Sequence, residues 1–432
     1  MDLLKIVNLL HAKKDLRMSK PKLQSPLFAG LDIGSTRVVA IAANLNKDGR
    51  LDIVGIGMAP NTGIRQGVVV NIEATTAAII KAKEEAELMS GYSIKEAWVG
   101  VSGTHIKSFN SRGMVAIKNK EVTTQDVERV LEAAQAVAVP TDRSLLHVLP
   151  RDFKVDGTEG IWDPIGMSGI RLEASIHLVT GGHTTLQNAT KCAEKAGIKV
   201  SGMILDPLAA SMAVLSEDEK NLGVCVVDIG GGTTNLLYFI NGHVAHTSVI
   251  PVGGQHFTQD IAIGLRTPQI SAEDIKKKFG CALVSLVSED EMIEVEGVGG
   301  RKSRTLRRRD LAEVIEPRAE EILQLIAKDI QQTGLLPFLG AGIVLTGGSS
   351  ELDGLVEMGE FIFDIPVRRG IPARVGGLTE VVKSPGYSTA VGLVLYGFEK
   401  YKLKTNGSKN EDLSETLAQA ARQIKGFFGK IF

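Results

Sequence analysis

The stretch Val226-Val-Asp-Ile-Gly-Gly-Gly-Thr-Thr-Asn-Leu-Leu-Tyr-Phe239 governs the interpretation of the rest of the chain. An apolar run ends at Asp228, three glycines follow, and a second apolar run begins at Leu236. This order predicts a β-hairpin with a glycine turn. Glycines accept positive φ angles and let a ligand approach the backbone without Cβ atoms in the way.

The turn of this hairpin suits a polyanion. Successive N–H groups in such a turn converge on a concavity that attracts phosphate oxygens, and the hydroxyls of Thr233 and Thr234 add donors. The carboxylate of Asp228 would repel phosphate, but it suits the hydrated Mg²⁺ that accompanies a nucleotide. Taken alone, the stretch is equally typical of a glycine-rich turn with an acidic neighbour.

Two other glycine turns follow apolar strands. Leu27–Ile33 contains Asp32 and leads through Gly34-Ser-Thr-Arg37 into the apolar run Val38–Ala43. The strand Ala341–Leu345 runs into Thr346-Gly-Gly-Ser-Ser350. Each turn alone is common. Their joint occurrence predicts two similar halves, with two phosphate hairpins opposite each other and a nucleotide between them.

Composition indicates a globular protein. At 432 residues the chain has room for about three domains. With 44% hydrophobic residues and a mean hydropathy of +0.09 it can bury a substantial core. A net charge of −1 gives no overall attraction to nucleic acid. The separated cysteines Cys192, Cys225 and Cys281 predict reduced core thiols in the cytosol. No apolar run approaches the roughly 20 residues of a membrane span, and no signal peptide is expected.

Periodicity predicts further elements along the chain. The expected strands are Leu51–Gly57, Ala97–Ser102, Leu145–Leu149, Arg171–Val179, Val200–Leu205 and Val244–Pro251. The expected helices are Ile72–Met89, Thr124–Val137 with Thr124 as N-cap, Thr184–Ala196, Pro207–Leu215, Ser271–Phe279, Leu311–Gln332, one that starts at Leu352, and Tyr387–Tyr396. A loop is expected at Gly157–Gly169 and a hairpin-like pair around Gly297–Gly300.

The three glycine turns carry a resemblance to a known superfamily. Asp32-Ile-Gly-Ser-Thr-Arg-Val, Asp228-Ile-Gly-Gly-Gly-Thr-Thr-Asn and Val344-Leu-Thr-Gly-Gly-Ser resemble the phosphate-1, phosphate-2 and adenosine motifs of the actin, heat-shock chaperone and sugar kinase superfamily. Within it the chain is similar to the FtsA family of bacterial cell-division actins over about Leu27 to Phe398 and the C-terminal helix. The matching stretches are Gly100-Val-Ser-Gly-Thr-His-Ile, His147-Val-Leu-Pro, Gly280-Cys-Ala-Leu, Leu311-Ala-Glu-Val-Ile-Glu-Pro-Arg and Tyr387-Ser-Thr-Ala-Val-Gly-Leu.

The resemblance implies an α/β, actin-like ATPase fold. Two duplicated ribonuclease-H-like subdomains would carry two inserted subdomains and a C-terminal amphipathic helix. The implied segments are a basic, loosely ordered leader (1–26), subdomain 1A (27–102, 181–221 and 385–401), inserted subdomain 1C (103–180), subdomain 2A (222–254 and 334–384), inserted subdomain 2B (255–333), a linker (402–412) and a membrane-targeting helix (413–432). A short amphipathic helix within the leader is the alternative.

The resemblance also implies ATP and Mg²⁺ as cofactors. Asp32 and Asp228 would hold Mg²⁺ through water. The nucleotide-binding residues would be Gly34, Ser35, Thr36 and Arg37 on one side of the phosphates, Gly230, Gly231, Gly232, Thr233, Thr234 and Asn235 on the other, and Gly347, Gly348 and Ser349 at the adenosine. Glu273 and Lys276, three apart on one helix face, match a nucleoside-contacting pair of bacterial actins. An ordinary surface ion pair is the alternative.

Asp206 is the candidate catalytic residue. Superfamily ATPases orient the attacking water with Gln or Glu at the start of the helix that here begins with Leu205-Asp-Pro-Leu-Ala209. Asp206 is one methylene shorter than Glu, and in-line attack tolerates little misplacement, so weak or negligible ATPase activity is expected. Alternatively, Asp206 caps this helix with Pro207 at its first position.

The end of the chain predicts a membrane-binding amphipathic helix. Apolar residues from Leu413 to Phe432 recur at three- and four-residue steps and form one stripe roughly 140° wide. Basic residues at its edges can reach lipid headgroups while phenylalanines enter the acyl boundary. The predicted membrane-contacting residues are Leu417, Ile424, Lys425, Phe427, Phe428, Lys430, Ile431 and Phe432. The alternative is that this helix packs on its own domain.

The implied function is that of a membrane adaptor. FtsA proteins polymerise and anchor the ring of the tubulin homologue FtsZ to the cytoplasmic face of the inner membrane at the division septum. The FtsZ C-terminal tail would bind subdomain 2B, where Arg301–Arg309 holds six cations, and other divisome proteins would bind subdomain 1C. A solvated loop also explains the charge run, and nucleic acid is not expected. The alternatives are a sugar or acid kinase and a chaperone ATPase without its substrate domain.

Overall fold

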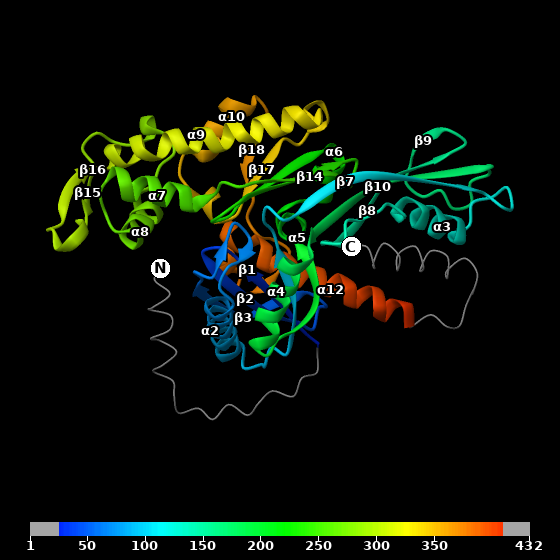
Figure 1. Cartoon of the computed structure of the whole chain (residues 1–432), viewed down its shortest axis with the longest axis horizontal. Coiled ribbons are helices and arrows are strands. Elements are labelled where there is room, and N and C mark those ends of the chain that lie inside the picture. The colour runs from blue at the N-terminus through cyan, green and yellow to red at the C-terminus, as the bar shows by residue number, and fades with distance from the viewer. Residues whose placement is uncertain (1–25, 409–432) are drawn as a thin grey trace.

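The computed structural model describes residues 26–408, with side chains through residue 403. The predicted leader 1–26, apart from its last residue, and the predicted C-terminal helix 413–432 lie outside the described residues. Figure 1 shows two halves, each built on a β-sheet, with two modules that project from them in opposite directions. Within residues 26–408, no helix has the length and apolar character that crossing a membrane requires.

The first half is built on a sheet with the strand order β11-β6-β1-β2-β3-β19. Its strands are β1 (Leu27–Ile33), β2 (Arg37–Leu45), β3 (Leu51–Pro60), β6 (Glu96–Val101), β11 (Lys199–Leu205) and β19 (Gly376–Gly377). Helices α2 (Ile72–Ser90) and α4 (His183–Lys195) cover one face, and α5 (Asp206–Val214) and α12 (Ser388–Ser408) cover the other. Because both faces are buried, the central strands are almost continuously apolar.

The second half is built on a sheet with the strand order β14-β13-β12-β17-β18. Its strands are β12 (Val224–Ile229), β13 (Thr234–Ile240), β14 (His243–Ile250), β17 (Ile343–Thr346) and β18 (Val367–Arg369). Helices α7 (Gly254–Gly264), α9 (Arg308–Thr333) and α10 (Leu355–Phe363) pack on one face. The other face shares a core with α5 and α12, so these two helices are buried between the sheets.

The two halves repeat the same hairpin. β1 pairs antiparallel with β2, and β12 pairs antiparallel with β13. Asp32 lies opposite Val39 and Asp228 lies opposite Asn235, the residue seven positions further along in each case. The glycine turns therefore emerge from equivalent places in the two sheets.

The module in residues 103–180 has its own sheet and core. The strand order is β7-β10-β8-β9, with β7 (Lys107–Ala116), β8 (Arg143–Val155), β9 (Thr158–Ile161) and β10 (Arg171–Gly182), and α3 (Thr124–Gln135) packs on it. The module adjoins β14 of the second half: Ser108 Oγ donates to the Thr247 oxygen at 2.9 Å, and the Trp162 ring stacks on His243. His177 on β10 lies 3.0 Å from Thr247 Oγ1 through its Nε2.

The module on the second half shares most of its core with that half and adds one small cluster, formed by Cys281, Val287 and Ala312. It comprises α7, α8 (Gln269–Phe279), β15 (Met292–Val295), β16 (Arg304–Arg307) and the start of α9, and its apolar residues continue the core of the second half. The remaining elements are short: β4 (Ile64–Arg65), β5 (Val68–Val69), α6 (Glu217–Leu222), α11 (Thr379–Val382), and 3₁₀ turns at Val284–Leu286, Val298–Gly300, Leu336–Phe338, Gly348–Glu351 and Pro385–Tyr387. All three cysteines are free and buried, as predicted.

Several predicted elements differ from the structure. The helix expected at 387–396 runs from Ser388 to Ser408, so residues 402–408 of the linker expected at 402–412 are helical. The helix expected at 124–137 ends at Gln135, and its N-cap is Thr123, because Thr123 and Asp126 form a reciprocal capping box. The expected strand 145–149 runs from Arg143 to Val155, and the loop after it holds the hairpin partner β9. The helix expected from Leu352 begins at Leu355, because Gly354 takes a positive φ of 76°.

Candidate functional site

The two phosphate turns have the same internal hydrogen bond. Gly34 N donates to the Arg37 oxygen at 3.0 Å, and Gly230 N donates to the Thr233 oxygen at 2.9 Å. Each bond closes the turn two residues after the aspartate that ends the preceding strand. The duplicated sequence pattern therefore produces a duplicated backbone, as the two-halves prediction requires.

The turns of the two halves lie against each other. A Cβ atom placed on Gly231 would lie 2.5 Å from Thr36 Cγ2, and one placed on Gly232 would lie 2.8 Å from Ser35 Oγ. Real Cβ contacts do not reach such distances. Neither Gly231 nor Gly232 has a positive φ, so close approach of the two turns, and not backbone conformation, favours glycine here. The structure thus brings together Ser35, Thr36, Gly231 and Gly232, which were predicted to face the phosphates.

Three aspartates lie beside these turns with raised pKa values. Burial raises the pKa of Asp32 to about 6, although the positive charge of Arg37 opposes the shift. Burial, and then the charge of Asp32, raise the pKa of Asp228 to about 7 against a hydrogen bond from Asn235. Burial and the charges of the other two aspartates raise the pKa of Asp206 well above its usual value. Such mutual repulsion indicates a site suited to a cation.

The donor set fits a hydrated Mg²⁺. Within the described residues no three His, Cys, Asp or Glu side chains are arranged to ligate a metal directly, so a Mg²⁺ ion here would keep most of its waters. Asp206 Oδ1 and Asn235 Oδ1 are buried and find no hydrogen-bond partner in residues 26–408. Waters around a cation could satisfy both oxygens. Asp32 and Asp228 flank the site from equivalent strand ends.

Asp206 does not cap its helix. The N-cap of α5 is Leu205, Asp206 is the first helical residue, and no side chain makes a capping hydrogen bond. The helix-cap alternative is therefore wrong. The carboxylate lies instead against β6, where a Cβ on Gly100 would be 2.5 Å from Asp206 Oδ1. The carboxylate is also close enough to Asp32 and Asp228 for their charges to raise its pKa.

The third glycine turn, residues 346–350, touches the turn at residues 230–233. Gly347 has a φ of 81°, and a Cβ on it would lie 2.3 Å from Asp228 Oδ1. Ser349 Oγ donates to the Gly230 oxygen at 3.3 Å. The guanidinium of Arg37 does not point across the phosphate turns: its Nη2 donates to the Gly386 oxygen at 2.8 Å, and it lies over the Tyr387 ring. Arg37 therefore links the phosphate-1 turn to the segment behind Gly348.

Glu273 and Lys276 are half-buried and form part of a hydrogen-bond network, unlike an ordinary surface pair. Lys276 Nζ lies 2.6 Å from Glu273 Oε2, and it donates to the Gly254 oxygen at 3.0 Å and to Thr258 Oγ1 at 2.9 Å. Gly254 N in turn donates to the Gly230 oxygen at 2.8 Å. The network ties α8 to the start of α7 and, through it, to the phosphate-2 turn. The nucleoside contact itself stays a prediction.

The sequence analysis missed the loop at residues 61–67. Asn61 Nδ2 donates to the Gly34 oxygen at 2.9 Å, and Gly67 N donates to Ser35 Oγ at 3.4 Å. Gln66 Nε2 donates to the Pro251 oxygen, at 3.2 Å, in the other half. The glycines at 63 and 67 signalled a loop, but nothing in the sequence placed that loop beside the phosphate-1 turn.

Comparison with known families identifies the chain. A family model described as "Cell division protein FtsA" matches residues 225–392, and one described as "SHS2 domain inserted in FTSA" matches residues 103–180, which hold β7 to β10 and α3. The cell division protein FtsA of Pseudomonas aeruginosa is 47% identical over 409 residues, which cover 93% of this chain and 98% of that protein. The chain belongs to the FtsA family. The predicted resemblance is confirmed.

Other FtsA proteins are similar over most of their length. The Escherichia coli protein is 43% identical over 382 residues, which cover 87% of this chain and 91% of that protein. The Bacillus subtilis protein is 40% identical over 380 residues, which cover 88% of this chain and 85% of that protein. As a member of the FtsA family, the chain is a cell-division protein. A sugar or acid kinase is not favoured.

Solved structures confirm the predicted fold class. The PilM-PilN type IV pilus biogenesis complex matches with a TM-score of 0.62 and 15% identity over 86% of this chain and 98% of that chain. MreB 5 of Spiroplasma citri bound to AMPPNP matches with a TM-score of 0.54 and 15% identity. The match covers 90% of this chain and 100% of that chain. At this identity the likeness concerns the fold alone, which is that of the actin-like ATPases.

Proposed function

We propose that this FtsA-family protein binds ATP, polymerises, and anchors the FtsZ ring to the cytoplasmic face of the inner membrane at the division septum, where it helps to recruit later divisome proteins. The observation that carries the nucleotide part is the meeting of two hairpins of identical register beside three buried aspartates. This duplicated arrangement has the symmetry of a clamp around a polyphosphate and its cation.

Different residues would bind the phosphates and the Mg²⁺ of MgATP. Backbone N–H groups of the two glycine turns, with the hydroxyls of Ser35, Thr36, Thr233 and Thr234, would receive the β- and γ-phosphates. Asp32 and Asp228 would hold Mg²⁺ through water, and the ion when bound would neutralise phosphate charge. A fold neighbour, MreB 5 of Spiroplasma citri, was solved with the ATP analogue AMPPNP, which supports ATP as the ligand.

Hydrolysis is proposed to be slow or negligible. Asp206 is buried beside Asp32 and Asp228, where Gln or Glu would orient the attacking water in related ATPases. Its side chain is one methylene shorter than Glu, and a misplaced water reacts slowly. ATP that bridges the halves would instead favour the closed form by differential binding, and the closed form would assemble into filaments.

Membrane attachment is assigned to the tail at 413–432, which lies outside the described residues. Its apolar stripe and its cations support an interfacial helix, and each cation contributes about 1 kcal/mol near anionic lipid. One tail should bind weakly. A filament that presents many tails binds strongly, because each later contact is made at high effective concentration.

The FtsZ tail is proposed to bind the 255–333 module, but few cations of the 301–309 run are available for it. Arg307 pairs with Asp310 at 2.6 Å, Arg308 with Glu291 at 3.0 Å, and Arg309 with Glu289 at 2.9 Å, while Arg304 donates to the Leu265 oxygen. Arg301 and Lys302 are exposed and have no ion pair within the described residues. An acidic peptide would therefore meet these two cations first. Other divisome proteins are assigned to the 103–180 module.

The decisive experiment is electron microscopy of the full chain with ATP and anionic liposomes. Filaments bound to lipid are expected with ATP and not without it. Turnover that depends on a small acceptor would instead support a kinase. A chain that ends at Lys404 should no longer co-sediment with anionic liposomes, and the exchange of Lys425 and Lys430 for Glu should weaken co-sedimentation. If the shortened chain still co-sediments, the tail is not the anchor.

A further inference from the structure

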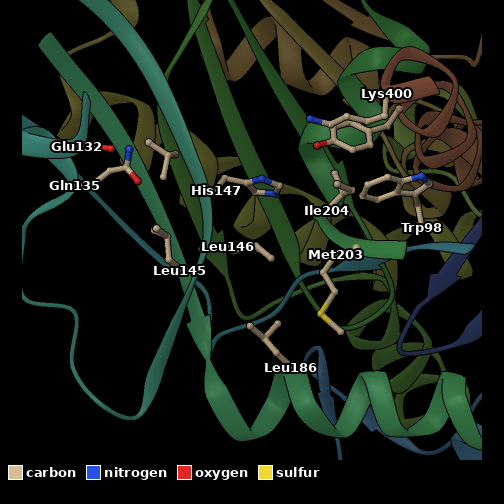
Figure 2. Close-up of a pocket in the computed structure, with 13 residues that line it drawn as sticks. Trp98, Glu132, Gln135, Leu145, Leu146, His147, Leu186, Met203, Ile204 and Lys400 are labelled. Atoms are coloured by element: carbon tan, nitrogen blue, oxygen red, sulfur yellow. The ribbon is translucent and has the colours of Figure 1, made fainter. Parts of the chain in front are cut away.

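A cavity of about 800 Å³ lies between the first half and the 103–180 module, away from the nucleotide cleft. Its volume is typical of ligand sites, which span about 300–1,000 Å³. Figure 2 shows Glu132 and Gln135 on one side, Trp98 and Lys400 on the other, and Leu145, Leu146, Leu186 and Met203 between them. None of the lining residues belongs to the three glycine turns.

The cavity wall combines apolar side chains with polar ones at its two ends. Trp98 packs edge-on against Tyr396, with ring centroids 4.9 Å apart, and it lies over Gly202, where a Cβ would meet the indole at 2.4 Å. The aromatic pair is fixed, so the indole cannot fold inward to fill the space. Leu145 on the opposite wall is 44% exposed. Leu145 thus offers an apolar contact to a segment that enters the cavity.

We propose that the chain's own amphipathic segment, residues 413–432, docks part of its apolar stripe in this cavity when no membrane is present. Helix α12 supplies Tyr396 and Lys400 to the wall, and the chain leaves the described region at the end of the same helix. The occupant is therefore covalently attached beside its site, which gives it a high effective concentration.

The connection is long enough for the segment to turn back. Helix α12 continues from Lys400 to Ser408, a rise of about 12 Å at 1.5 Å per residue. From residue 408 to residue 413 the chain can span up to about 17 Å when extended. The segment can thus return to the level of Lys400. Glu132, on the far rim, is exposed and opposite in charge to Lys425 and Lys430 at the edges of the stripe.

Docking should be partial and reversible. The cavity is too small for the whole stripe, so a few large side chains such as Phe427 and Phe428 would enter while the rest stay outside. A docked stripe cannot contact lipid, and the apparent affinity for membrane falls by the docked fraction. Docking rests on the stripe and the cavity alone. Only its effect on lipid binding rests on the proposed membrane function.

Trp98 reports on the cavity directly, because the chain has only two tryptophans. In the full chain with Trp162→Phe, Trp98 is the sole indole. Acrylamide quenching of Trp98 should rise at least about twofold when the same chain ends at Ser408. Addition of anionic vesicles to the full chain should produce the same rise. Equal quenching in the full and shortened chains would overturn the proposal.

A charged wall should release the tail. Leu145→Glu is expected to raise co-sedimentation with limiting anionic vesicles about threefold, while Leu88→Glu, at an 81% exposed position on α2, should leave it unchanged. If Trp98 responds to truncation but neither chain binds vesicles, docking stands and the membrane assignment fails. If vesicle binding is strong but Leu145→Glu does not alter it and quenching is insensitive to truncation, docking fails and the anchor stands.

Cross-linking identifies the occupant. Leu145→Cys combined with Phe428→Cys should form a disulfide within one chain at low protein concentration, since the three native cysteines are buried. A disulfide that forms only between chains would assign the cavity to a second copy and overturn the proposal. Leu88→Cys with Phe428→Cys is the matched control and should not cross-link.

Discussion

The side-chain amide of Gln66 donates a hydrogen bond to the main-chain oxygen of Pro251 at 3.2 Å and so joins the two halves. Gln66 has a φ of 49°, a conformation that residues other than glycine adopt at a cost of about 1 kcal/mol or more. The next residue, Gly67, donates to Ser35 Oγ in the phosphate-1 turn. The contact between the halves is therefore coupled to the turn that would hold the phosphates.

Gln66→Ala should speed the release of bound nucleotide. A hydrogen bond of this kind contributes about 1 kcal/mol, so release of a fluorescent ATP analogue should accelerate about fivefold in stopped-flow displacement. Arg65→Ala changes the exposed neighbour and serves as the control. Release at the wild-type rate from the Gln66 variant would show that the bond does not hold the cleft closed.

Gly231→Ala should impair nucleotide binding by keeping the turns apart. The added Cβ would meet Thr36 Cγ2 at 2.5 Å, so either the cleft opens or a turn shifts. We expect at least a tenfold loss of affinity by calorimetry. Thr36→Ala removes the opposing methyl and hydroxyl, and the double variant should recover part of the loss relative to Gly231→Ala alone. No recovery would mean that backbone conformation, and not contact between the turns, demands glycine.

Asp206→Asn should stabilise the nucleotide-free protein at pH 7.5 while abolishing any residual ATP turnover. The substitution removes a charge that burial and two neighbouring aspartates disfavour, and each unit by which its pKa is raised returns about 1.4 kcal/mol. Urea unfolding measures the gain, and the exposed Asp218→Asn is the control. ATP affinity should stay within a few-fold; a large loss would assign Asp206 to metal binding.

The pH dependence of stability should expose opposite contributions from two buried groups. Asp228 has a pKa of about 7 in the folded chain against 3.8 ordinarily, so the native state binds more protons and this contribution to stability falls as pH rises from about 4 to 7. Burial lowers the pKa of His177 from 6.5 to about 3, so its contribution falls as pH drops below 6.5. The two effects oppose each other in the wild type.

Asp228→Asn should remove one contribution that strengthens as the pH falls, while the other buried aspartates and histidines keep theirs. Between pH 7 and pH 5 the variant is expected to lose about 2 kcal/mol more stability than the wild type in urea unfolding with EDTA and no nucleotide. Identical profiles for the variant and the wild type would mean that Asp228 has its ordinary pKa in the folded chain. MgATP should flatten the difference at neutral pH by stabilising the charged carboxylate.

Local sequence order predicted much of the fold. A hairpin is specified by an apolar strand that ends in an aspartate and is followed by small residues and a second apolar strand. Strand pairing and turn formation depend on residues close together in the chain, so this order can be recognised in the sequence. The boundaries that failed were set by competing local signals: Thr123 outcompeted Thr124 as N-cap because only it has an acidic partner three residues on. The helix expected from Leu352 was delayed by Gly354, whose left-handed backbone ends the preceding turn.

The sequence by itself determined the two aspartate-glycine hairpins and the glycine turn at 346–350, since each is a pattern of adjacent residues. The amphipathic helix at 413–432, which lies outside the described residues, stays a prediction. Only the tertiary structure decided that Asp206 lies among the charges of Asp32 and Asp228, that Arg37 turns back to Gly386, and that Gln66 reaches the opposite half. These contacts join residues far apart in the chain. Their direction depends on how two sheets pack around α5 and α12, which no local pattern encodes.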